Sequence, residues 1–404
     1  MSQSPVSLPR TRHVWFAAAS LLLGTLAGLL LAEVGLRARE AIAPPSPRPQ
    51  EQRLPLFVPN PHGSGSFRLR TSARFEVRVG TQDVTLRTNS LGMAWREVSL
   101  QAPPGKRRLA FLGDSFAMGC WARDAAHGFV GVVEAQLNPE RFEVLNFGVG
   151  GYGPEDQALL LDEEVLRFSP SWVVVTLFNG NDFRDAYLGL DKDRLVDGSV
   201  ELREDVIRER VPPEYWRHSG PVSLPAAERS AWRAALRRSA LFRATAPWLR
   251  LENLGLQFVP SPQFTQYSFW SRVPVPPVAL RARDVALAAV GRMEAALAAA
   301  GGRLGIVSLP SWEQVYAVEA AGSDFDIALP QVYVQTYARE RGIPYLDLLP
   351  ILRDHVARSN ERLYVVGDTH WNERGHALAG EAIVRWFRCC VRSGRPGVAS
   401  GGEP

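Results

Sequence analysis

The sequence predicts an α/β protein, a three-layer α/β/α sandwich built on a mainly parallel, five-stranded sheet. From residue 107 onward, short apolar segments alternate with helical stretches, which is typical of parallel strands joined by crossover helices. Polar or glycine-rich segments directly follow the first three strand segments, where open α/β sheets bind their ligands. An apolar helix and a small β subdomain are predicted ahead of the sandwich.

The apolar helix is predicted from an uncharged segment, Val14–Ala32, which follows a tail at residues 1–13. A helix over this segment is about 28 Å long, close to the thickness of a hydrocarbon core. The apolar cores of signal peptides are shorter, at about 7–15 residues. The segment therefore predicts a single-pass membrane anchor, with a cleaved signal sequence as the alternative. Because no second such segment follows, we expect the rest of the chain to be extracytoplasmic, in the periplasm.

The next two stretches lead to the main domain. Residues 41–56 are rich in proline and predict an extended linker. Residues 57–106 contain three segments, starting at Phe67, Arg74 and Val84, that alternate apolar and polar residues. This alternation is the period of half-buried strands, so we predict a small β subdomain.

The main domain is predicted over residues 107–390, and right-handed crossovers between its strands place helices on both faces of the sheet. Its strand segments are Leu109–Leu112, Phe142–Phe147, Trp172–Phe178, Leu304–Leu309 and Pro344–Leu348. Its helical segments are Ala125–Leu137, Pro154–Phe168, Leu280–Ala300, Ile327–Arg341 and Glu373–Cys389.

Residues 185–280 interrupt the alternation of strands and helices. They contain a helical segment, Ala226–Trp248, and an aromatic run, Phe264–Trp270. The stretch leaves the sheet after the third strand and returns at the fourth. We interpret it as an insertion over the rim, either a lid or substrate platform or a structural addition without a binding role. The glycine-rich tail, residues 391–404, is predicted to be disordered.

The composition excludes several classes of protein. Hydrophobic residues make up 46% of the 404 and charged residues 22%, which argues against a disordered chain. The net charge of +4 comes from basic residues spread along the chain, so no nucleic-acid partner is expected.

The sequence has too few cysteines for a disulfide scaffold: Cys120, Cys389 and Cys390. Spare thiols are expected, with a bridge from Cys120 to the last helix as the alternative. The sequence contains no metal-ligand spacing, phosphate loop or dinucleotide fingerprint, so neither a metal nor a cofactor is expected.

The residues with the clearest chemical meaning are a serine, a histidine and an aspartate. Ser115 directly follows the first strand segment, whereas Asp368 and His370 lie just before the final helix. A serine becomes a nucleophile when a histidine accepts its proton and a carboxylate holds that histidine in the right tautomer. The chain order Ser, Asp, His is one that some α/β hydrolases also use. We therefore predict Ser115 as nucleophile, His370 as base and Asp368 as orienting acid.

Two loops can supply hydrogen-bond donors for the oxyanion that acyl transfer creates. The window Gly148–Tyr152, after the second strand segment, contains three glycines, which let main-chain N–H groups approach a ligand. The third strand segment is followed by Asn181, whose amide lies at the same rim.

These segments occur in order along the chain, and together they resemble the SGNH (GDSL-type) hydrolases over about residues 107–390, apart from the insertion. The resemblance implies the flavodoxin-like SGNH hydrolase fold. It assigns the nucleophile to Ser115 and the acid and base to Asp368 and His370. It assigns the oxyanion hole to the N–H groups of Ser115 and Gly151 and the side-chain amide of Asn181.

Three details bear on the resemblance to this family. Asn89-Ser-Leu-Gly92 is similar to a stretch that membrane-anchored bacterial members often carry before the sheet. Most members have the aspartate three residues before the histidine, whereas here it is two residues before, in Asp368-Thr-His-Trp371. That spacing is similar to the branch of alginate O-acetyltransferases. Gly150 replaces a common serine, which matters little because the family uses only backbone there.

The resemblance implies a serine hydrolase that acts on carboxylic esters, esterase- or lipase-like, at the cell surface or in the periplasm. The partners it implies are a small-molecule or polysaccharide acyl ester and, through the N-terminal helix, the membrane. An O-acetyltransferase or deacetylase of a cell-surface polysaccharide is the first alternative, because it uses the same catalytic residues. A non-catalytic glycan-binding protein is the second, and the intact Ser115, Asn181, Asp368 and His370 argue against it.

Other titratable residues receive structural interpretations. Asp114 is expected to fix the turn beside the nucleophile. Asp182 and Asp185 are expected to be solvated acids of an exposed loop, with a place in the lining of the site as the alternative. His376 is expected to pack or cap within the final helix rather than act as the base.

Overall fold

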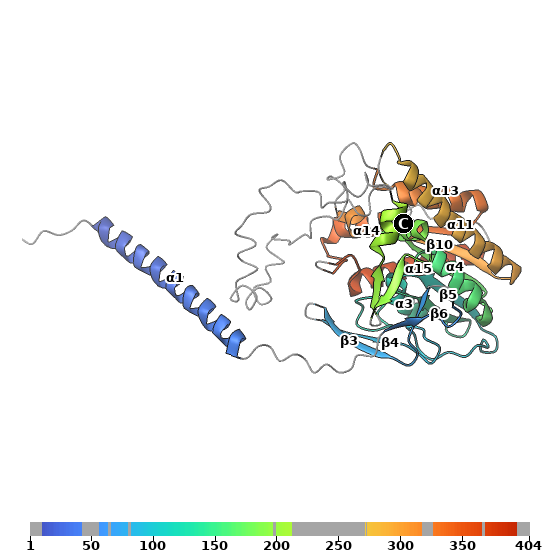
Figure 1. Ribbon diagram of the computed structural model, residues 1–404, viewed down its shortest axis with the longest axis horizontal. Helices are drawn as coiled ribbons and strands as arrows, with labels where there is room; N and C mark the ends of the chain where they lie inside the picture. Colours follow the sequence, from blue (N-terminus) through green and yellow to red (C-terminus); the bar gives the residue numbers. More distant parts are fainter. Residues whose placement is uncertain are drawn as a thin grey trace, which may run out of the picture. The chain divides into compact units, whose positions relative to one another are not determined.

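Five parallel strands form the central sheet (Figure 1). In a computed structural model the described residues are 10–42, 56–63, 66–79, 82–196, 199–211, 271, 273–316, 326–365 and 368–393. The sheet order β11-β10-β7-β5-β6 is the flavodoxin-like order, with the first strand between the second and third. The predicted five-stranded parallel sheet is confirmed. The strands are β5 (Arg107–Gly113), β6 (Phe142–Gly148), β7 (Trp172–Phe178), β10 (Arg303–Leu309) and β11 (Tyr345–Asp347).

The inner strands are apolar because both faces of the sheet are covered. Every residue of β7 is buried, and β5 and β10 each expose only the arginine with which they begin. In the register, Gly113 pairs with Gly148 and Leu309 with Phe178. The carboxyl ends of the strands therefore meet at one edge of the sheet.

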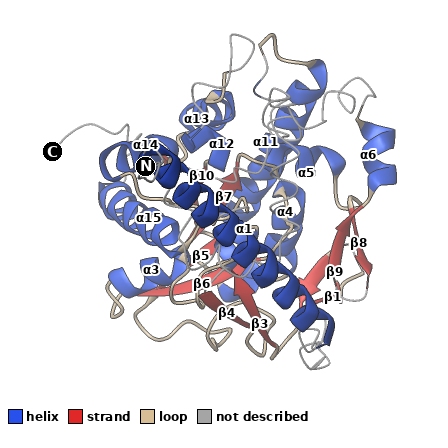
Figure 2. Cartoon of the chain, turned by 90° about the vertical axis from the view of Figure 1, so that its left-hand side faces the viewer, coloured by secondary structure: helices blue, strands red, loops and turns tan. Residues whose placement is uncertain are grey.

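Helices cover both faces of the sheet and complete the predicted three layers (Figure 2). On one face α3 (Phe129–Gln136) packs against α15 (Glu373–Ser393); on the other, α4 (Pro154–Glu163) and α5 (Asp182–Leu188) pack against α11 (Pro277–Ala299). The remaining helices of this part are α2 (Ser115–Met118), the 3-10 helix η1 (Val165–Phe168), α6 (Glu204–Arg210), α12 (Trp312–Tyr316), α13 (Leu329–Arg341) and α14 (Leu349–Ser359).

Several predicted helix boundaries are wrong. The helix predicted from Ala125 begins at Phe129, because the Asp124 side chain accepts hydrogen bonds from the N–H groups of Ala126 and His127 and closes a turn first. The single helix predicted over Pro154–Phe168 divides at Glu164 into α4 and η1. The final helix continues to Ser393, into the predicted tail.

Antiparallel hairpins flank the sandwich. The predicted alternating segments are strands: β2 (Phe67–Leu69) pairs with β1 (Phe57–Pro59), and β3 (Arg74–Val79) pairs with β4 (Gln82–Arg87). A further hairpin, β8 (Asp193–Val196) with β9 (Ser199–Leu202), lies inside the predicted insertion. The segments Ala226–Trp248 and Phe264–Trp270, predicted as the rest of that insertion, lie outside the described residues.

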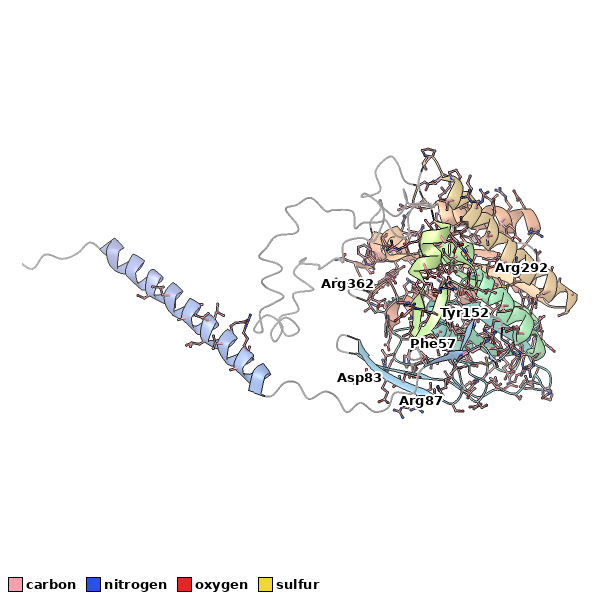
Figure 3. The ribbon with its side chains drawn as sticks, viewed as in Figure 1. Phe57, Asp83, Arg87, Tyr152, Arg292 and Arg362 are labelled. Carbon is pink, nitrogen blue, oxygen red and sulfur yellow. The ribbon has the colours of Figure 1, made fainter. Side chains whose placement is uncertain are left out.

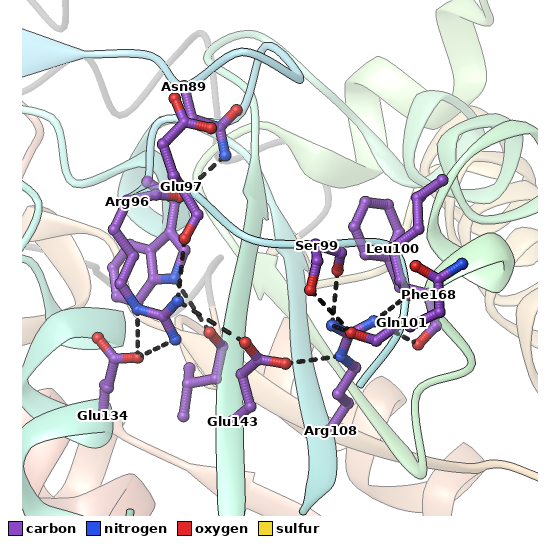
Figure 4. Close-up of polar contacts among 12 residues, drawn as sticks. Asn89, Arg96, Glu97, Ser99, Leu100, Gln101, Arg108, Glu134, Glu143 and Phe168 are labelled. Carbon is purple, nitrogen blue, oxygen red and sulfur yellow. Dashed lines mark hydrogen bonds and ion pairs between the residues drawn. The ribbon is translucent and has the colours of Figure 1, made fainter. Parts of the chain in front are cut away.

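A buried arginine fixes the amino-terminal end of β5 (Figure 4). The Arg108 guanidinium donates to the backbone carbonyls of Ser99 at 2.6 Å, Gln101 at 2.8 Å and Phe168 at 3.0 Å. It also pairs with Glu143 at 2.7 Å. Since a buried charge is costly unless it is paired and hydrogen-bonded, these contacts explain how Arg108 is tolerated in the core. They lie at the opposite end of β5 from Ser115.

Helix α1 (Arg10–Ile42) contains the segment that was predicted as a membrane anchor. Within the described residues, the structure contains no helix whose length and apolar character suffice for crossing a membrane. The anchor stays a prediction.

Candidate active site

Ser115, the predicted nucleophile, lies on a tight turn between β5 and α2. Asp114 caps α2, because its carboxylate accepts the Phe116 N–H at 2.9 Å, which confirms its expected role in the turn. Gly148 lets α2 lie close to the neighbouring strand end: a Cβ at this position would be 2.2 Å from the Met118 nitrogen. Ser115 is therefore held at the sheet edge where the strand order reverses, the usual ligand site of open α/β sheets.

The three predicted residues lie in hydrogen-bond contact. Ser115 Oγ is 2.7 Å from His370 Nε2, and His370 Nδ1 is 2.5 Å from Asp368 Oδ1. The same carboxylate oxygen accepts the backbone N–H of His370 at 3.0 Å. With Nδ1–H donating to Asp368, Nε2 is the acceptor for the Ser115 hydroxyl. This is the geometry that activates a serine.

A buried tryptophan holds the loop of the histidine in place. Trp371 is fully buried and bridges Tyr364 in antiparallel fashion. Its ring meets Phe116 edge-on at 4.8 Å, and the Phe116 ring in turn lies 5.0 Å from the His370 ring. Phe116 and Trp371, which directly follow the predicted nucleophile and base, thus pack on each other and join two segments that lie far apart in the sequence.

The pKa of Asp368 reflects this geometry. Burial acts to raise the pKa of Asp368, but the hydrogen bonds and charge of His370 outweigh it, and the pKa lies below its ordinary value. The carboxylate therefore stays ionised beside the imidazole.

The predicted oxyanion donors lie on the loops at either side of Ser115, because β5 lies between β6 and β7. Gly151 has φ +86°, a conformation that favours glycine. Asn181 lies at the N-cap position of α5 but makes no side-chain capping bond. Its Nδ2 donates to Asp185 Oδ2 at 2.8 Å, while its Oδ1 is buried without a hydrogen-bond partner among the described residues. The predicted donation from Asn181 to the oxyanion requires the other N–H of Nδ2, the one that does not bond to Asp185. The oxyanion hole itself stays a prediction.

The expectation that Asp182 and Asp185 are solvated is wrong, since both are buried. Asp182 accepts the backbone N–H of Phe178 at 2.8 Å, and Asp185 accepts from Asn181 and Arg184. Burial raises the pKa of Asp182 well above its ordinary value. The helix α5, which the pattern did not predict, folds both acids against the sheet.

His376 is a packing residue, as expected. It is fully buried, its Nδ1 accepts the Phe129 N–H at 3.3 Å, and its Nε2 donates to the Cys120 carbonyl at 3.1 Å. These contacts require the neutral imidazole with the proton on Nε2. His376 thus joins α15 to α3 and to the loop that follows the nucleophile.

We expect His376 to make the protein sensitive to acid. Burial lowers the pKa of His376 from 6.5 to about 4, so between these values the unfolded chain takes up a proton that the folded chain does not. The contribution is fully present above pH 6.5 and is lost as the pH falls toward 4, about 3 kcal/mol in all. In His376→Gln, the free energy of unfolding should fall less between pH 6.5 and pH 4.5 than in the wild type, measured by urea denaturation.

Comparing the two proteins separates the contribution of His376 from that of buried carboxyls, whose effect on stability has the opposite pH dependence. Burial raises the pKa values of Asp114, Asp193 and Asp347 to about 6, so these carboxyls favour the folded state as the pH falls below 6. They are the same in both proteins. The control is His62→Gln, at a solvent-exposed histidine. Parallel pH curves for the wild type and His376→Gln would contradict the assignment.

The structure also brings residues to the site that the sequence analysis did not select. Trp121 has φ +64°, and its ring stands perpendicular to His370 at 6.1 Å. Lys192 forms a buried ion pair with Asp156, which accepts the backbone N–H of Gly153, two residues after Gly151. No sequence motif predicts these residues at the site. The positive φ of a tryptophan and the burial of a lysine both depend on tertiary packing. Cys120 is a free thiol, and burial raises its pKa to about 12.

The fold and these side chains define the class of protein: a flavodoxin-like α/β sandwich that carries a serine, a histidine and an aspartate in contact at the sheet edge. Residues 276–389 match the family model of the SGNH hydrolase-like domain of the acetyltransferase AlgX. Over these residues, which include Asp368 and His370, the chain is similar to the SGNH hydrolase-like family. The predicted resemblance, including the similarity to the alginate acetyltransferase branch, is confirmed.

The solved structures to which this chain is similar are distant in sequence. A two-domain esterase (CEX) active on acetylated mannans, co-crystallized with mannopentaose, is 12% identical with a TM-score of 0.39, over 73% of this chain and 53% of that one. A catalytic mutant of Axe2, an acetylxylan esterase from Geobacillus stearothermophilus, is 12% identical with a TM-score of 0.37, over 70% and 94%. LAE5, an alpha/beta hydrolase from the metagenome of Lake Arreo, Spain, is 11% identical with a TM-score of 0.38, over 70% and 95%.

The chain thus spans about half the length of the first of these structures. No curated protein sequence matches it.

Proposed function

We propose that this protein is a serine enzyme that cleaves carboxylic esters through an acyl-enzyme intermediate. The observation that carries the proposal is the contact of Ser115 Oγ with His370 Nε2 at 2.7 Å, completed by His370 Nδ1 and Asp368 at 2.5 Å. A serine at the ligand edge of the sheet needs this partner to become a nucleophile.

In the proposed reaction Ser115 Oγ attacks the acyl carbonyl while His370 Nε2 takes its proton, and Asp368 stabilises the resulting imidazolium. The tetrahedral oxyanion is held by the N–H groups of Ser115 and Gly151 and the Asn181 amide. The leaving alcohol takes the proton from His370, and an acyl ester of Ser115 remains. Water or a second hydroxyl then gives its proton to His370 and attacks this ester, which releases the acyl group and restores Ser115.

The matched family model supports an acetyl group as the acyl unit, and the resemblance to alginate O-acetyltransferases supports a polysaccharide as the carrier. The matched family model is that of an acetyltransferase. Aspartate two residues before histidine, as in Asp368-Thr-His370, is the spacing of that branch. Transfer of the acetyl group to a sugar hydroxyl is therefore the second candidate, and it uses the same residues with a different acceptor.

The test supplies the full-length protein with 4-nitrophenyl acetate, with and without an unacetylated polysaccharide such as polymannuronate. We expect nitrophenol release and a transient acetyl adduct on Ser115, detected by mass spectrometry. Free acetate as the main product in both arms identifies a hydrolase, whereas acetyl groups found on the polysaccharide identify a transferase. A folded protein that forms neither adduct nor product would refute the proposal in favour of glycan binding without catalysis.

We further propose that the catalytic part acts outside the cytoplasm, tethered to the membrane by Val14–Ala32. The support is the uncharged sequence of this segment, about 28 Å long as a helix, close to the hydrocarbon thickness. The full-length protein should stay in the membrane fraction after an alkaline wash and be digested by protease added to spheroplasts. Recovery in the cytosolic fraction would contradict this location.

A further inference from the structure

Lys192 is a buried cation near the candidate active site. It lies between α5 and β8, and its side chain is 1% exposed. Its Nζ pairs with Asp156 Oδ2 at 2.5 Å and with Asp193 Oδ2 at 3.1 Å. Burial alone would lower the pKa of Lys192, but the neighbouring carboxylates outweigh burial and raise it, so the amine stays charged. A buried ion pair is a weak source of stability, because desolvation opposes the attraction.

The partner of Lys192, Asp156, holds the loop that carries Gly151. Asp156 belongs to the first turn of α4 and is buried. Its Oδ2 accepts the backbone N–H of Gly153 at 3.0 Å, and its Oδ1 accepts the Ser66 hydroxyl at 3.0 Å. The ion pair thus acts on the backbone two residues beyond the predicted oxyanion donor.

A second set of contacts fixes the same loop from β2. The Tyr152 hydroxyl, whose side chain is labelled in Figure 3, donates to the Phe67 carbonyl and accepts from the Arg68 guanidinium. Gly151 therefore directly precedes two anchored residues, Tyr152 and Gly153, and its position depends on both anchors.

Lys192 also acts on the other predicted donor. Its charge interacts with Asp185, the residue that accepts the Asn181 amide at 2.8 Å. The two loops touch at this point: a Cβ on Gly153 would lie 2.7 Å from Asp185 Cβ. The cation and its carboxylates thus connect the loop of Gly151 with that of Asn181.

We propose that Lys192 is a positioning residue for the oxyanion hole: through Asp156 and Asp185 it fixes the Gly151 N–H and the Asn181 amide in the geometry of the tetrahedral intermediate. The inference rests on the proposed function. Preorganised donors lower the barrier because they need no rearrangement when the oxyanion forms. Lys192 touches neither substrate nor the reacting atoms, so its effect should appear in kcat and leave substrate binding and the histidine unchanged.

The test compares kcat and KM for 4-nitrophenyl acetate in Lys192→Met and in the wild type, both full length. Met removes the charge and keeps an unbranched chain. We expect kcat to fall about 10- to 100-fold, less than the 10²–10³-fold typical of deleting a donor itself. The value of KM and the pH profile of kcat/KM should not change, since the latter reports the base of the free enzyme. The control is Arg194→Met, a cation on the same hairpin whose exposed side chain pairs with Glu201.

A double-mutant cycle with Asn181→Ala separates positioning from a general loss of order. If Lys192 acts through the oxyanion donors, the two substitutions should be less than additive in log kcat. Full additivity would mean that Lys192 does not act through Asn181.

Lys192→Met leaves Asp156 as an unpaired buried charge, so folding is checked by thermal unfolding. If the single variant does not fold, the double variant Lys192→Met/Asp156→Asn replaces it. Asn at position 156 keeps an acceptor for the Gly153 N–H and carries no charge, so the same fall in kcat is expected. Folded variants with wild-type kcat would overturn the role of Lys192 while leaving the proposed function intact. A wild type that neither turns over the ester nor forms the acetyl adduct would refute the proposed function, and the role of Lys192 with it.

Discussion

Replacing Ser115 by alanine is expected to abolish turnover, with kcat falling by about 10⁶, the scale reached when the nucleophile of a serine hydrolase is removed. The reason is that no acyl-enzyme can form without Oγ, and His370 Nε2 loses the hydroxyl that it contacts at 2.7 Å. The substitution removes one atom at the edge of the sheet, so the thermal unfolding midpoint should not change. The measurements are initial rates with 4-nitrophenyl acetate and labelling by a fluorophosphonate.

A matched control is Ser90→Ala, which removes a hydroxyl that bonds to Glu97 on an exposed loop. It should keep both turnover and labelling. Labelling of folded Ser115→Ala to the extent of the wild type would identify a different nucleophile and defeat the assignment.

Replacing Asp368 by asparagine is expected to lower kcat by about 10⁴, the effect typical of this exchange in a serine–histidine–aspartate site. The carboxylate accepts from His370 Nδ1 at 2.5 Å and so leaves Nε2 free to take the serine proton. An amide can donate to Nδ1 instead, which places the imidazole proton on Nε2, and it carries no charge to stabilise the imidazolium. The measurement is kcat for the wild type and the variant, with kcat/KM followed against pH.

The matched control is Asp354→Asn on the exposed surface of α14, where the carboxylate faces Arg358 at 3.8 Å. It should leave kcat unchanged. If folded Asp368→Asn kept kcat within about tenfold of the wild type, Asp368 would not be the orienting acid. The alternative would then be Asp114, which is buried and interacts electrostatically with His370.

The sheet and the location of the site could be predicted from the sequence because both depend on local patterns. A strand covered on both faces must be apolar throughout, as β7 is, so such strands stand out in the sequence. The carboxyl ends of parallel strands share one edge, which places Ser115, Gly151 and Asn181 on adjacent loops once the strand order is known. Asp368 and His370 are neighbours in the sequence, so their contact needs little more than a turn.

Helix boundaries and buried charges could not be predicted in this way. The late start of α3 depends on the Asp124 side chain, which competes with the helix for the backbone N–H groups. The sequence predicts Asp182 and Asp185 at the surface, because a charged side chain is usually exposed unless a partner reaches it. For the same reason no sequence pattern predicts that Lys192 is buried.

The sequence by itself thus determined the layered fold and the side chains available for chemistry at the site. These are a serine, an aspartate and a histidine, in the chain order that some α/β hydrolases use. Only the tertiary structure decided which groups hold that chemistry in place: Trp371 beneath the histidine loop, and Lys192 between Asp156 and Asp193. The physical reason is that hydrophobic periodicity and turn residues act over a few neighbours in the chain. The pairing of buried charges depends on contacts between segments that only folding brings together.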